Sequence, residues 1–213
     1  VKIEYAGTTF LVDPMLADKD AYPGFQGTVN SQLRYPLVDL PVAVEEVIEA
    51  DAVIVTHTHA DHWDEAAQQM IPKNMPIFAQ NEQDAEQIRQ DGFTDVRLLN
   101  EETEFDGTQL VLTDGQHGTD EIMATMARAL GTTSGIIFKR EGYKTTYVAG
   151  DTVWTGAVEE AISTHKPDVI VLNSGDARLE GFEGSIIMGK EDVLRAYNYA
   201  PEAVVINSHM EAV

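Results

Sequence analysis

The segment "VIVTHTHADHWD", residues 53–64, constrains the fold of this chain more than any other feature of its sequence. It places three of the six histidines and two aspartates directly after a short run of β-branched residues. Side chains at positions i and i+2 of an extended segment point to the same side, so His57 and His59 can bind one metal ion together. The fold must therefore present this segment at the end of a buried strand.

Asp61 and His62 come next, where the chain turns into a helix predicted over residues 63–71. Residues at such a turn can point in a different direction from the preceding pair. They can then bind a second ion a few Å away, the separation typical of two-metal hydrolases. Asp64 stands at the start of the helix, where we expect it to cap the helix and to interact favourably with its dipole.

Three further candidate ligands lie in loops that directly follow predicted strands. His117 lies in "TDGQHGTD", Asp151 ends "YVAGD", and His209 lies in "INSHM". The remaining histidine, His165, is predicted at the C-terminus of a helix, where an imidazolium favours the helix dipole, so we leave it out of the site. Five of the six histidines thus fall at strand ends, a pattern that favours a metal site over scattered structural histidines.

Strand patterns and helix patterns alternate along the whole chain. Apolar, β-type runs occur at 9–12, 52–55, 76–79, 95–99, 109–113, 134–139, 143–149, 168–172 and 203–207. Helical patterns lie at 42–50, 63–71, 81–91, 120–130, 156–166 and 190–199. This interleaving predicts an α/β or α+β protein, with layered sheets and outer helices.

Two pairs of segments resemble each other, which indicates an internal repeat. "TTFLVDP" (8–14) is similar to "TTYVAGD" (145–151), and residues 45–59 are similar to residues 159–175. Any helix–strand unit has some of this likeness, so chance resemblance is the alternative. A true repeat predicts two similar halves whose strand ends face one another. It would bring together the loops after residues 55, 150 and 207.

The longest stretch without periodicity is 14–41, which holds four of the eight prolines. A loop of this length inside a compact domain is usually functional or disordered. Large apolar and aromatic side chains argue against disorder here, namely Tyr22, Phe25, Leu33 and Tyr35. We therefore predict an ordered lid or a contact with a second copy of the chain in a homo-oligomer.

Composition limits the chemistry and the partners. The 36 acidic and 14 basic residues give a formal net charge of −22, which repels nucleic acids and anionic membranes. Cysteine is absent, so a metal must be held by imidazole and carboxylate, which suits Zn²⁺, Mn²⁺ or Fe²⁺. The sequence contains no dinucleotide or Walker A motif and no apolar run of about 18 residues, so we expect neither a nucleotide cofactor nor a membrane span.

The length of 213 residues suits a single domain over residues 1–213. The chain starts without Met or a secretory signal pattern and stops soon after "NSHM". We therefore expect a cytoplasmic protein whose sequence is trimmed at both ends.

From Thr8 to the C-terminus the chain resembles the metallo-β-lactamase superfamily, through "THTHADH" followed by His117, Asp151 and His209. The resemblance implies a four-layer αβ/βα sandwich of two similar halves, with metals at one edge between the sheets. It also implies that His57, His59 and His117 hold one metal. Asp61, His62 and His209 would hold the second, with Asp151 bridging the two.

The segments "LVDPMLA", "LNSGDA" and "NSHMEA" resemble the small branch that includes ascorbate-6-phosphate lactonase. We accordingly expect hydrolysis of a small ester-like substrate, with a lactone favoured and a sugar lactone such as ascorbate 6-phosphate included. Two metals sharing a water lower its pKa and create a hydroxide nucleophile, and Asp61 is the candidate to orient it or shuttle its proton.

Three other functions use the same fold or residues. They are a phosphodiesterase or nuclease, a di-iron oxygen reductase, and a metal-binding scaffold without catalysis. A phosphodiesterase or nuclease would need a basic surface or insert that binds RNA. A di-iron oxygen reductase would have a carboxylate in place of one of the histidines and would need an electron-carrying partner. The sequence shows neither feature. The intact ligand set argues against the third.

Five residues are candidate substrate contacts: Arg34, Tyr35, Trp154, Asp176 and Arg178. The arginines could pair with an anionic group and the aromatic rings could line a pocket. The alternatives are surface ion pairs for the arginines and core packing for Trp154. Asp13, the counterpart of Asp151 in the suspected repeat, is expected either to orient a ligand histidine or to form a plain turn before Pro14.

Overall fold

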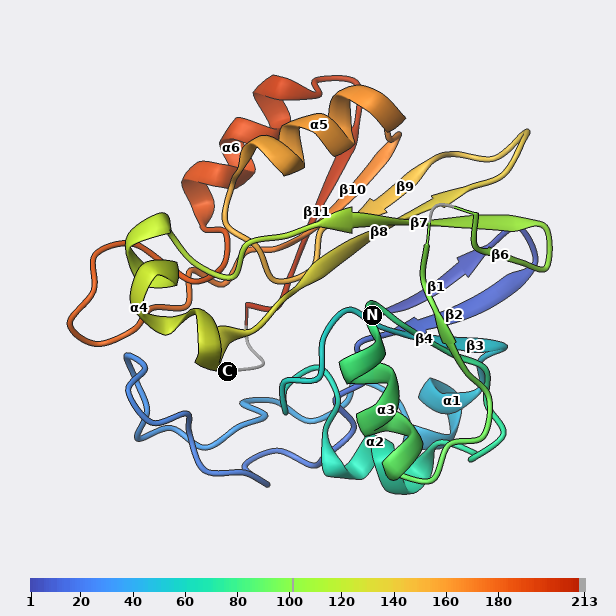
Figure 1. The fold of residues 1–213 in the computed structure, drawn as a ribbon, viewed down its shortest axis with the longest axis horizontal. Coiled ribbons are helices and arrows are strands. Elements are labelled where there is room, and N and C mark those ends of the chain that lie inside the picture. The colour runs from blue at the N-terminus through green and yellow to red at the C-terminus, as the bar shows by residue number, and fades with distance from the viewer. Residues whose placement is uncertain (101, 211–213) are drawn as a thin grey trace.

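The computed structural model describes residues 1–100 and 102–210, which form two β-sheets lying face to face (Figure 1). The first sheet has the order β1 (Lys2–Tyr5), β2 (Thr8–Val12), β3 (Ala52–Val55), β4 (Ile77–Ala79) and β5 (Val96–Leu98). The second has the order β11 (Val204–Ser208), β10 (Val169–Asn173), β9 (Thr146–Val148), β8 (Ser134–Lys139), β7 (Thr108–Asp114) and β6 (Glu104–Phe105).

Helices cover the outer face of each sheet and complete the four predicted layers. The first sheet is covered by α1 (Val44–Ile48), α2 (Glu65–Met70) and α3 (Glu82–Gln90), and the second by α5 (Gly156–His165) and α6 (Lys190–Tyr199). Strand β3 is apolar throughout because both of its faces are buried. Ile54 joins the core between the sheets, and Val53 and Val55 join the core under the helices. The predicted αβ/βα fold class is confirmed.

The suspected repeat corresponds to two parallel strand–helix–strand units. Strand β2 pairs with β3 in parallel after α1, and β9 pairs with β10 in parallel after α5. Asp13 follows β2 and Asp151 follows Gly150 at the end of β9, so the two aspartates occupy corresponding positions in the two units. The two halves therefore present their strand ends to each other.

The predicted helices are all present. Helix α1 differs most from its predicted length, because it covers only Val44–Ile48 and has no side-chain cap. Strands β1 and β6 were not predicted. Strand β1 has four residues and β6 has two, so neither is long enough for its alternation to stand out. They form because each closes a tight hairpin onto a longer neighbour, β2 or β7.

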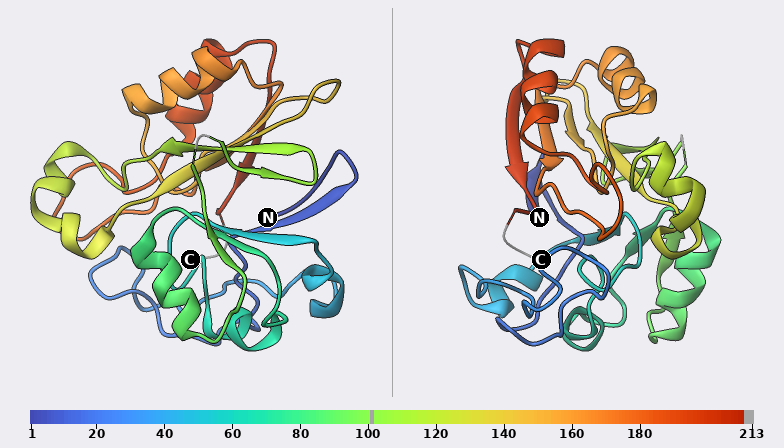
Figure 2. Two further views of the ribbon diagram at one scale, coloured as in Figure 1. Left: turned by 45° about the vertical axis from the view of Figure 1, so that its right-hand side comes forward. Right: turned by 90° about the vertical axis from the view of Figure 1, so that its left-hand side faces the viewer.

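Helix α4 (Asp120–Leu130) belongs to neither outer layer. Its buried side chains Ile122 and Leu130 pack against Leu179 and Ile186 of the long connection between β10 and α6. Figures 1 and 2 show α4 and this connection at one edge of the sandwich, beside the blue segment that contains residues 14–41. Within the described part of the chain, no helix combines the length and the apolar character needed to cross a membrane.

Candidate metal centre

The ends of four strands bring the predicted ligands to one edge of the sandwich. His57 and His59 follow β3, Asp151 follows β9, His117 follows β7 and His209 follows β11. Gly150 is needed at the second of these ends, because its φ is +68° and a Cβ there would overlap the carbonyl oxygen of Ser134. The structure thus brings together the loops after residues 55, 150 and 207, as the repeat predicts.

His57, His59 and His117 form the first group of candidate ligands, with one atom from each lying within 4.8 Å of the others. His57 Nε2 is 3.0 Å from His59 Nδ1. His117 Nδ1 lies 2.9 Å from the carbonyl oxygen of Ile186, to which it donates in the corresponding tautomer, and this contact directs Nε2 toward the cluster.

Asp61, His62, Asp151 and His209 form the second group under the same distance limit. His62 Nε2 lies 3.1 Å from His209 Nε2 and 3.1 Å from Asp151 Oδ2. His209 Nε2 lies 3.2 Å from Asp61 Oδ2. The Asp151 Oδ2 atom is also 3.7 Å from His117 Nε2, so Asp151 lies between the two groups, where a bridging ligand would have to be.

The donor set fits divalent cations. Ring nitrogens face each other in two places at 3.0 and 3.1 Å, with carboxylate oxygens beside them. Such a convergence of lone pairs is costly in a buried place unless protons or cations lie between them. Imidazole and carboxylate together are ligands that Zn²⁺, Mn²⁺ and Fe²⁺ all accept.

Hydrogen bonds from outside the two groups also fix His62 and Asp151. Asp13 Oδ2 lies 2.9 Å from His62 Nδ1, and the same carboxylate accepts from the backbone N–H and the hydroxyl of Thr56. Asn173 Nδ2 donates to Asp151 Oδ1 at 2.8 Å. Of the two roles expected for Asp13, the contact with a ligand histidine is the one observed. Asn173 was not predicted, and its place at the end of β10 is the signal that could have indicated it.

Burial and mutual charge shift the pKa values inside the cluster. Burial alone would lower the pKa of His62, but the carboxylates of Asp151, Asp13 and Asp61 outweigh it and hold the pKa well above its ordinary value. Burial would raise the pKa of Asp151, yet the neighbouring histidines, His62 first, hold it well below its usual range. Burial, followed by the charge of His62, lowers the pKa of His57, which favours the neutral imidazole that metals bind.

Asp64 lies outside both groups and caps α2, as predicted. Its Oδ1 accepts from the backbone N–H of Ala67 at 2.7 Å. Its Oδ2 accepts from the backbone N–H groups of Leu16 and Ala17, so the carboxylate also anchors the start of the 14–41 segment. The segment is therefore ordered at this end, although it contains neither a helix nor a named strand.

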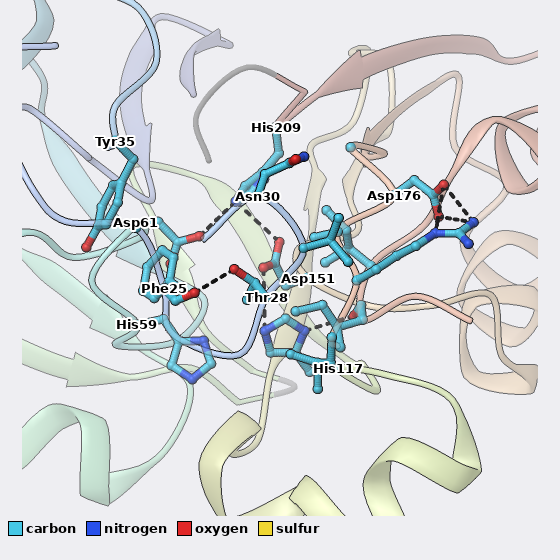
Figure 3. A pocket seen from close by; sticks show the side chains of 18 of the residues that line it. Phe25, Thr28, Asn30, Tyr35, His59, Asp61, His117, Asp151, Asp176 and His209 are labelled. Atoms are coloured by element: carbon cyan, nitrogen blue, oxygen red, sulfur yellow. Dashed lines mark hydrogen bonds and ion pairs between the residues drawn. The ribbon is translucent and has the colours of Figure 1, made fainter. Parts of the chain in front are cut away.

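The cluster opens onto a pocket of about 630 Å³. Figure 3 shows five of the seven candidate ligands on its wall, namely His59, Asp61, His117, Asp151 and His209. The rest of the wall is mainly apolar and comes from the 14–41 segment, from α4 and from the connection after β10. The candidate metal centre is thus reached through a largely apolar chamber.

Three of the five candidate substrate contacts line this pocket: Tyr35, Asp176 and Arg178. Burial, followed by the charge of Asp61, raises the pKa of Tyr35 to about 12, so its hydroxyl keeps its proton at neutral pH. Arg178 is paired with Asp176, with Nη2 2.9 Å from Oδ2.

The other two candidates do not lie on the pocket wall. Arg34 donates to the backbone carbonyls of Asp20 and Ala21, and so braces the 14–41 segment instead of facing a ligand. Trp154 donates to Glu159 and packs edge-on against Tyr199 of α6, which is the packing alternative considered for it. The direction in which an arginine or a tryptophan side chain points cannot be inferred from the sequence alone.

Comparison with known proteins identifies the family. A sequence model described as the β-lactamase superfamily domain matches residues 8–210. The chain belongs to that superfamily. Within it the chain falls in the UPF0173 group, since the UPF0173 protein YddR of Bacillus subtilis strain 168 is 46% identical over 215 residues, which span all of this chain and 83% of YddR.

Two crystal structures of members of the superfamily are similar to this chain over its whole length. An isothiocyanate hydrolase from gut bacteria of Delia radicum is 48% identical, with a TM-score of 0.96 over 100% of this chain and 82% of that one. A protein described as a possible metal-dependent hydrolase, from Veillonella parvula DSM 2008, is also 48% identical, with a TM-score of 0.98 and the same coverage. The narrower resemblance to ascorbate-6-phosphate lactonase is not confirmed by these relatives.

Proposed function

We propose that this protein is a metal-dependent hydrolase that binds two divalent cations and cleaves a small, neutral substrate at an electrophilic carbon. The observation that carries the proposal is the position of the histidine–aspartate cluster on the wall of an apolar pocket. A metal-binding scaffold without catalysis has no need of such a chamber, whereas a hydrolase needs one to hold its substrate.

The two groups of side chains supply a site for each ion. His57, His59 and His117 would hold the first ion, Asp61, His62 and His209 the second, and Asp151 would contact both. Two cations held in this way would lower the pKa of a shared water and provide a hydroxide nucleophile at neutral pH.

Asp61 is the residue of the cluster best placed to move a proton. Its carboxylate lies on the pocket wall, and its Oδ2 is 3.2 Å from His209 Nε2. We assign its Oδ1 the task of orienting the nucleophile, accepting its proton and returning that proton to the leaving group. His62, on the far side, is held in its orientation by Asp13.

An isothiocyanate is the substrate class that fits the pocket best. Water adds to the central carbon of R–N=C=S, and the resulting thiocarbamate breaks its C–N bond while nitrogen takes up a proton. The products are an amine, R–NH₂, and carbonyl sulfide. The 48% identical isothiocyanate hydrolase and the apolar wall both support this class.

Phosphorylated or nucleic acid substrates find less support in the pocket. Arg178 is the one guanidinium or ammonium group among the described residues that line it, and that group is already paired with Asp176. The net charge of −22 adds a repulsive field. A neutral lactone, the class favoured by the sequence, offers a similar electrophilic carbon and belongs in the same assay. A sugar lactone phosphate would lack a free cation as its partner.

The test is a metal titration with a substrate panel. Protein stripped with a chelator is reloaded with Zn²⁺ or Mn²⁺ and assayed on benzyl isothiocyanate, a neutral γ-lactone and bis(p-nitrophenyl) phosphate. We expect amine release from the isothiocyanate, with a plateau near two ions per chain. A plateau at one ion would contradict the binuclear site, and cleavage of the phosphodiester alone would favour the nuclease alternative. Metal binding without any hydrolysis would contradict the enzyme.

A further inference from the structure

We propose that the apolar part of the pocket is a subsite for a ring-sized apolar group of the substrate, and that the α4 wall limits how large that group can be. The inference rests on the proposed function and deepens it, because it concerns the part of the substrate that does not react. It is carried by the volume of the pocket, the origin of its walls and the absence of a free cation among its described lining residues.

The pocket is much larger than the reacting group needs. Its volume is about 630 Å³, while an isothiocyanate reacts through three atoms in a row. A closed apolar cavity of about 150 Å³ holds a benzene ring. The space left after the reacting atoms are placed at the cluster therefore holds a ring with a short alkyl spacer, and a methyl group would leave most of it unfilled.

Three separate parts of the chain supply the apolar wall: Phe25, Val29 and Leu33 from the 14–41 segment, Met126 and Leu130 from α4, and Leu179 from the connection after β10. Leu130 and Leu179 belong to one buried cluster, so this side of the wall is firmly packed. The ring of Phe25 is stacked on Tyr35, with centroids 4.6 Å apart and planes inclined by 16°. An aromatic ring of the pocket wall is thus already held in position, beside His59 and Asp61 (Figure 3).

The two loops that form the roof are joined to each other. Thr28 and Leu179 form an isolated antiparallel bridge, in which the N–H of Val29 donates to the carbonyl of Arg178 at 2.9 Å. The N–H of Glu180 donates to the carbonyl of Gly27 at 2.8 Å. These bonds join the two loops, and the packing of Leu179 against Leu130 ties the joined loops to α4. The width of the chamber therefore depends on the side chains of α4.

The chamber also selects against ionic groups. Both side-chain nitrogens that Arg178 directs at Asp176 lie within 3.2 Å of its carboxylate oxygens. A carboxylate or phosphate on the substrate would have to compete with that pairing inside an acidic protein. An uncharged ring buries its apolar surface favourably without such competition.

Helix α4 offers a matched pair of positions for testing the subsite. Ala129 and Ala127 are both exposed, but only Ala129 is among the residues that line the pocket. The substitution Ala129→Leu adds three carbons to the chamber wall, and Ala127→Leu adds the same three carbons to the same helix away from it. Neither position is in the buried core, so both variants are expected to fold.

The experiment uses the full, metal-loaded chain and compares kcat/KM for methyl, allyl, benzyl and 2-phenylethyl isothiocyanate. In the parent protein we expect the benzyl and phenylethyl compounds to exceed the methyl compound by at least tenfold. In Ala129→Leu the benzyl-to-methyl ratio should fall more than tenfold, mainly through KM. The ratio should stay within twofold of the parent in Ala127→Leu.

A binding measurement separates failure of this inference from failure of the proposed function. N-benzylthiourea keeps the ring and the thiocarbonyl but lacks the reactive cumulated carbon, and its affinity can be measured by calorimetry. A tenfold loss of affinity in Ala129→Leu alone, without turnover of any isothiocyanate, would support the subsite and overturn the proposed reaction. Equal ratios and equal affinities in both leucine variants, or no binding to the parent protein, would overturn the subsite.

Discussion

The two ends of the pocket are built in different ways. At the cluster end, the side chains follow strand ends and are fixed by buried hydrogen bonds, such as that between Asp151 and Asn173. At the apolar end, the wall comes from loops and α4, and some of its side chains stay half exposed, Val29 by 51% and Leu33 by 46%. A reaction at a metal ion needs ligand atoms that are positioned to within a fraction of an ångström, whereas an apolar wall needs only a shape complementary to the substrate. Substitutions at the first end should therefore abolish activity, and those at the second should change substrate preference.

The largest effect is expected from Asp151→Asn, because Asp151 lies between the two ligand groups. The asparagine keeps the shape and an oxygen for Asn173, but it loses the negative charge that both ions would share. We expect kcat/KM to fall by more than about 1,000-fold, since removing one member of a unit that acts jointly can cost nearly as much as removing the whole unit.

Metal content by mass spectrometry and a hydrolysis assay check this prediction. Asp114→Asn is the control, because Asp114 also ends a strand but is exposed and lies in neither group. Full metal content and activity in Asp151→Asn would remove Asp151 from the centre.

Asp13→Asn should have the next largest effect. Asp13 contacts His62 Nδ1 and so orients a ligand without belonging to either group. Loss of such an orienting carboxylate typically lowers metal affinity or activity by about 10- to 100-fold. The affinity is measured by competition with a chelator, with the exposed Asp18→Asn as control. Unchanged metal affinity together with an unchanged kcat at full metal loading would contradict the orienting role.

The cluster end could be predicted from sequence because strand ends follow simple rules. A buried strand such as β3 is apolar on both faces, and the histidines after it must meet the polar residues after its neighbours. The correspondence of Asp13 with Asp151 follows from the internal repeat, and the order of the four layers was implied by the resemblance to the metallo-β-lactamase superfamily. Asn173, the last residue of β10, was not predicted, because an amide at a strand end is a weaker sign of a metal site than a histidine or a carboxylate.

The apolar end could not be predicted in the same way. Residues 14–41 have no period, and their positions depend on contacts with distant partners, such as the bridge between Thr28 and Leu179. Arg34 illustrates the difficulty, because an arginine in a loop can meet a ligand or its own backbone, and here it meets the carbonyls of Asp20 and Ala21. Only the three-dimensional structure shows which loop residues face the chamber.

Asp64→Ala should loosen the apolar end while leaving the cluster in place. The carboxylate caps α2 and accepts from the backbone N–H groups of Leu16 and Ala17, which would be left without that acceptor. We expect the free energy of unfolding to fall by about 2 kcal/mol, from the lost cap and the unsatisfied buried donors. KM for ring-bearing substrates should rise more than kcat falls. Glu65→Ala, which removes an exposed acid from the same turn, should do neither.

The pH dependence of stability should separate metal-free from metal-loaded protein. Burial opposes the charge of His62, but its carboxylate neighbours hold its pKa well above the ordinary 6.5. Its protonation therefore stabilises the metal-free fold fully below about pH 6.5, and this contribution is lost as the pH rises through the raised value.

Metal binding needs neutral imidazoles, so the loaded protein should become more stable over the same pH range. Thermal melts of both forms from pH 6 to 9 should show Tm changes of a few degrees with opposite signs. Parallel curves would mean that bound metal does not replace the proton on His62.

The smallest effect concerns the ion pair at the apolar end. Asp176→Asn removes the carboxylate that holds Arg178 and leaves its guanidinium free on the pocket wall. Both side chains are about half exposed, so the pair is worth no more than about 1 kcal/mol, a factor of about five in binding. We expect inhibition by 3-phenylpropionate to strengthen by two- to fivefold, while inhibition by the neutral 3-phenylpropanamide stays the same. Adding Arg178→Gln should cancel the gain. If the propionate binds equally well to the parent protein and the variant, Arg178 does not face the ligand, and the preference of the chamber for neutral groups must come from its apolar wall alone.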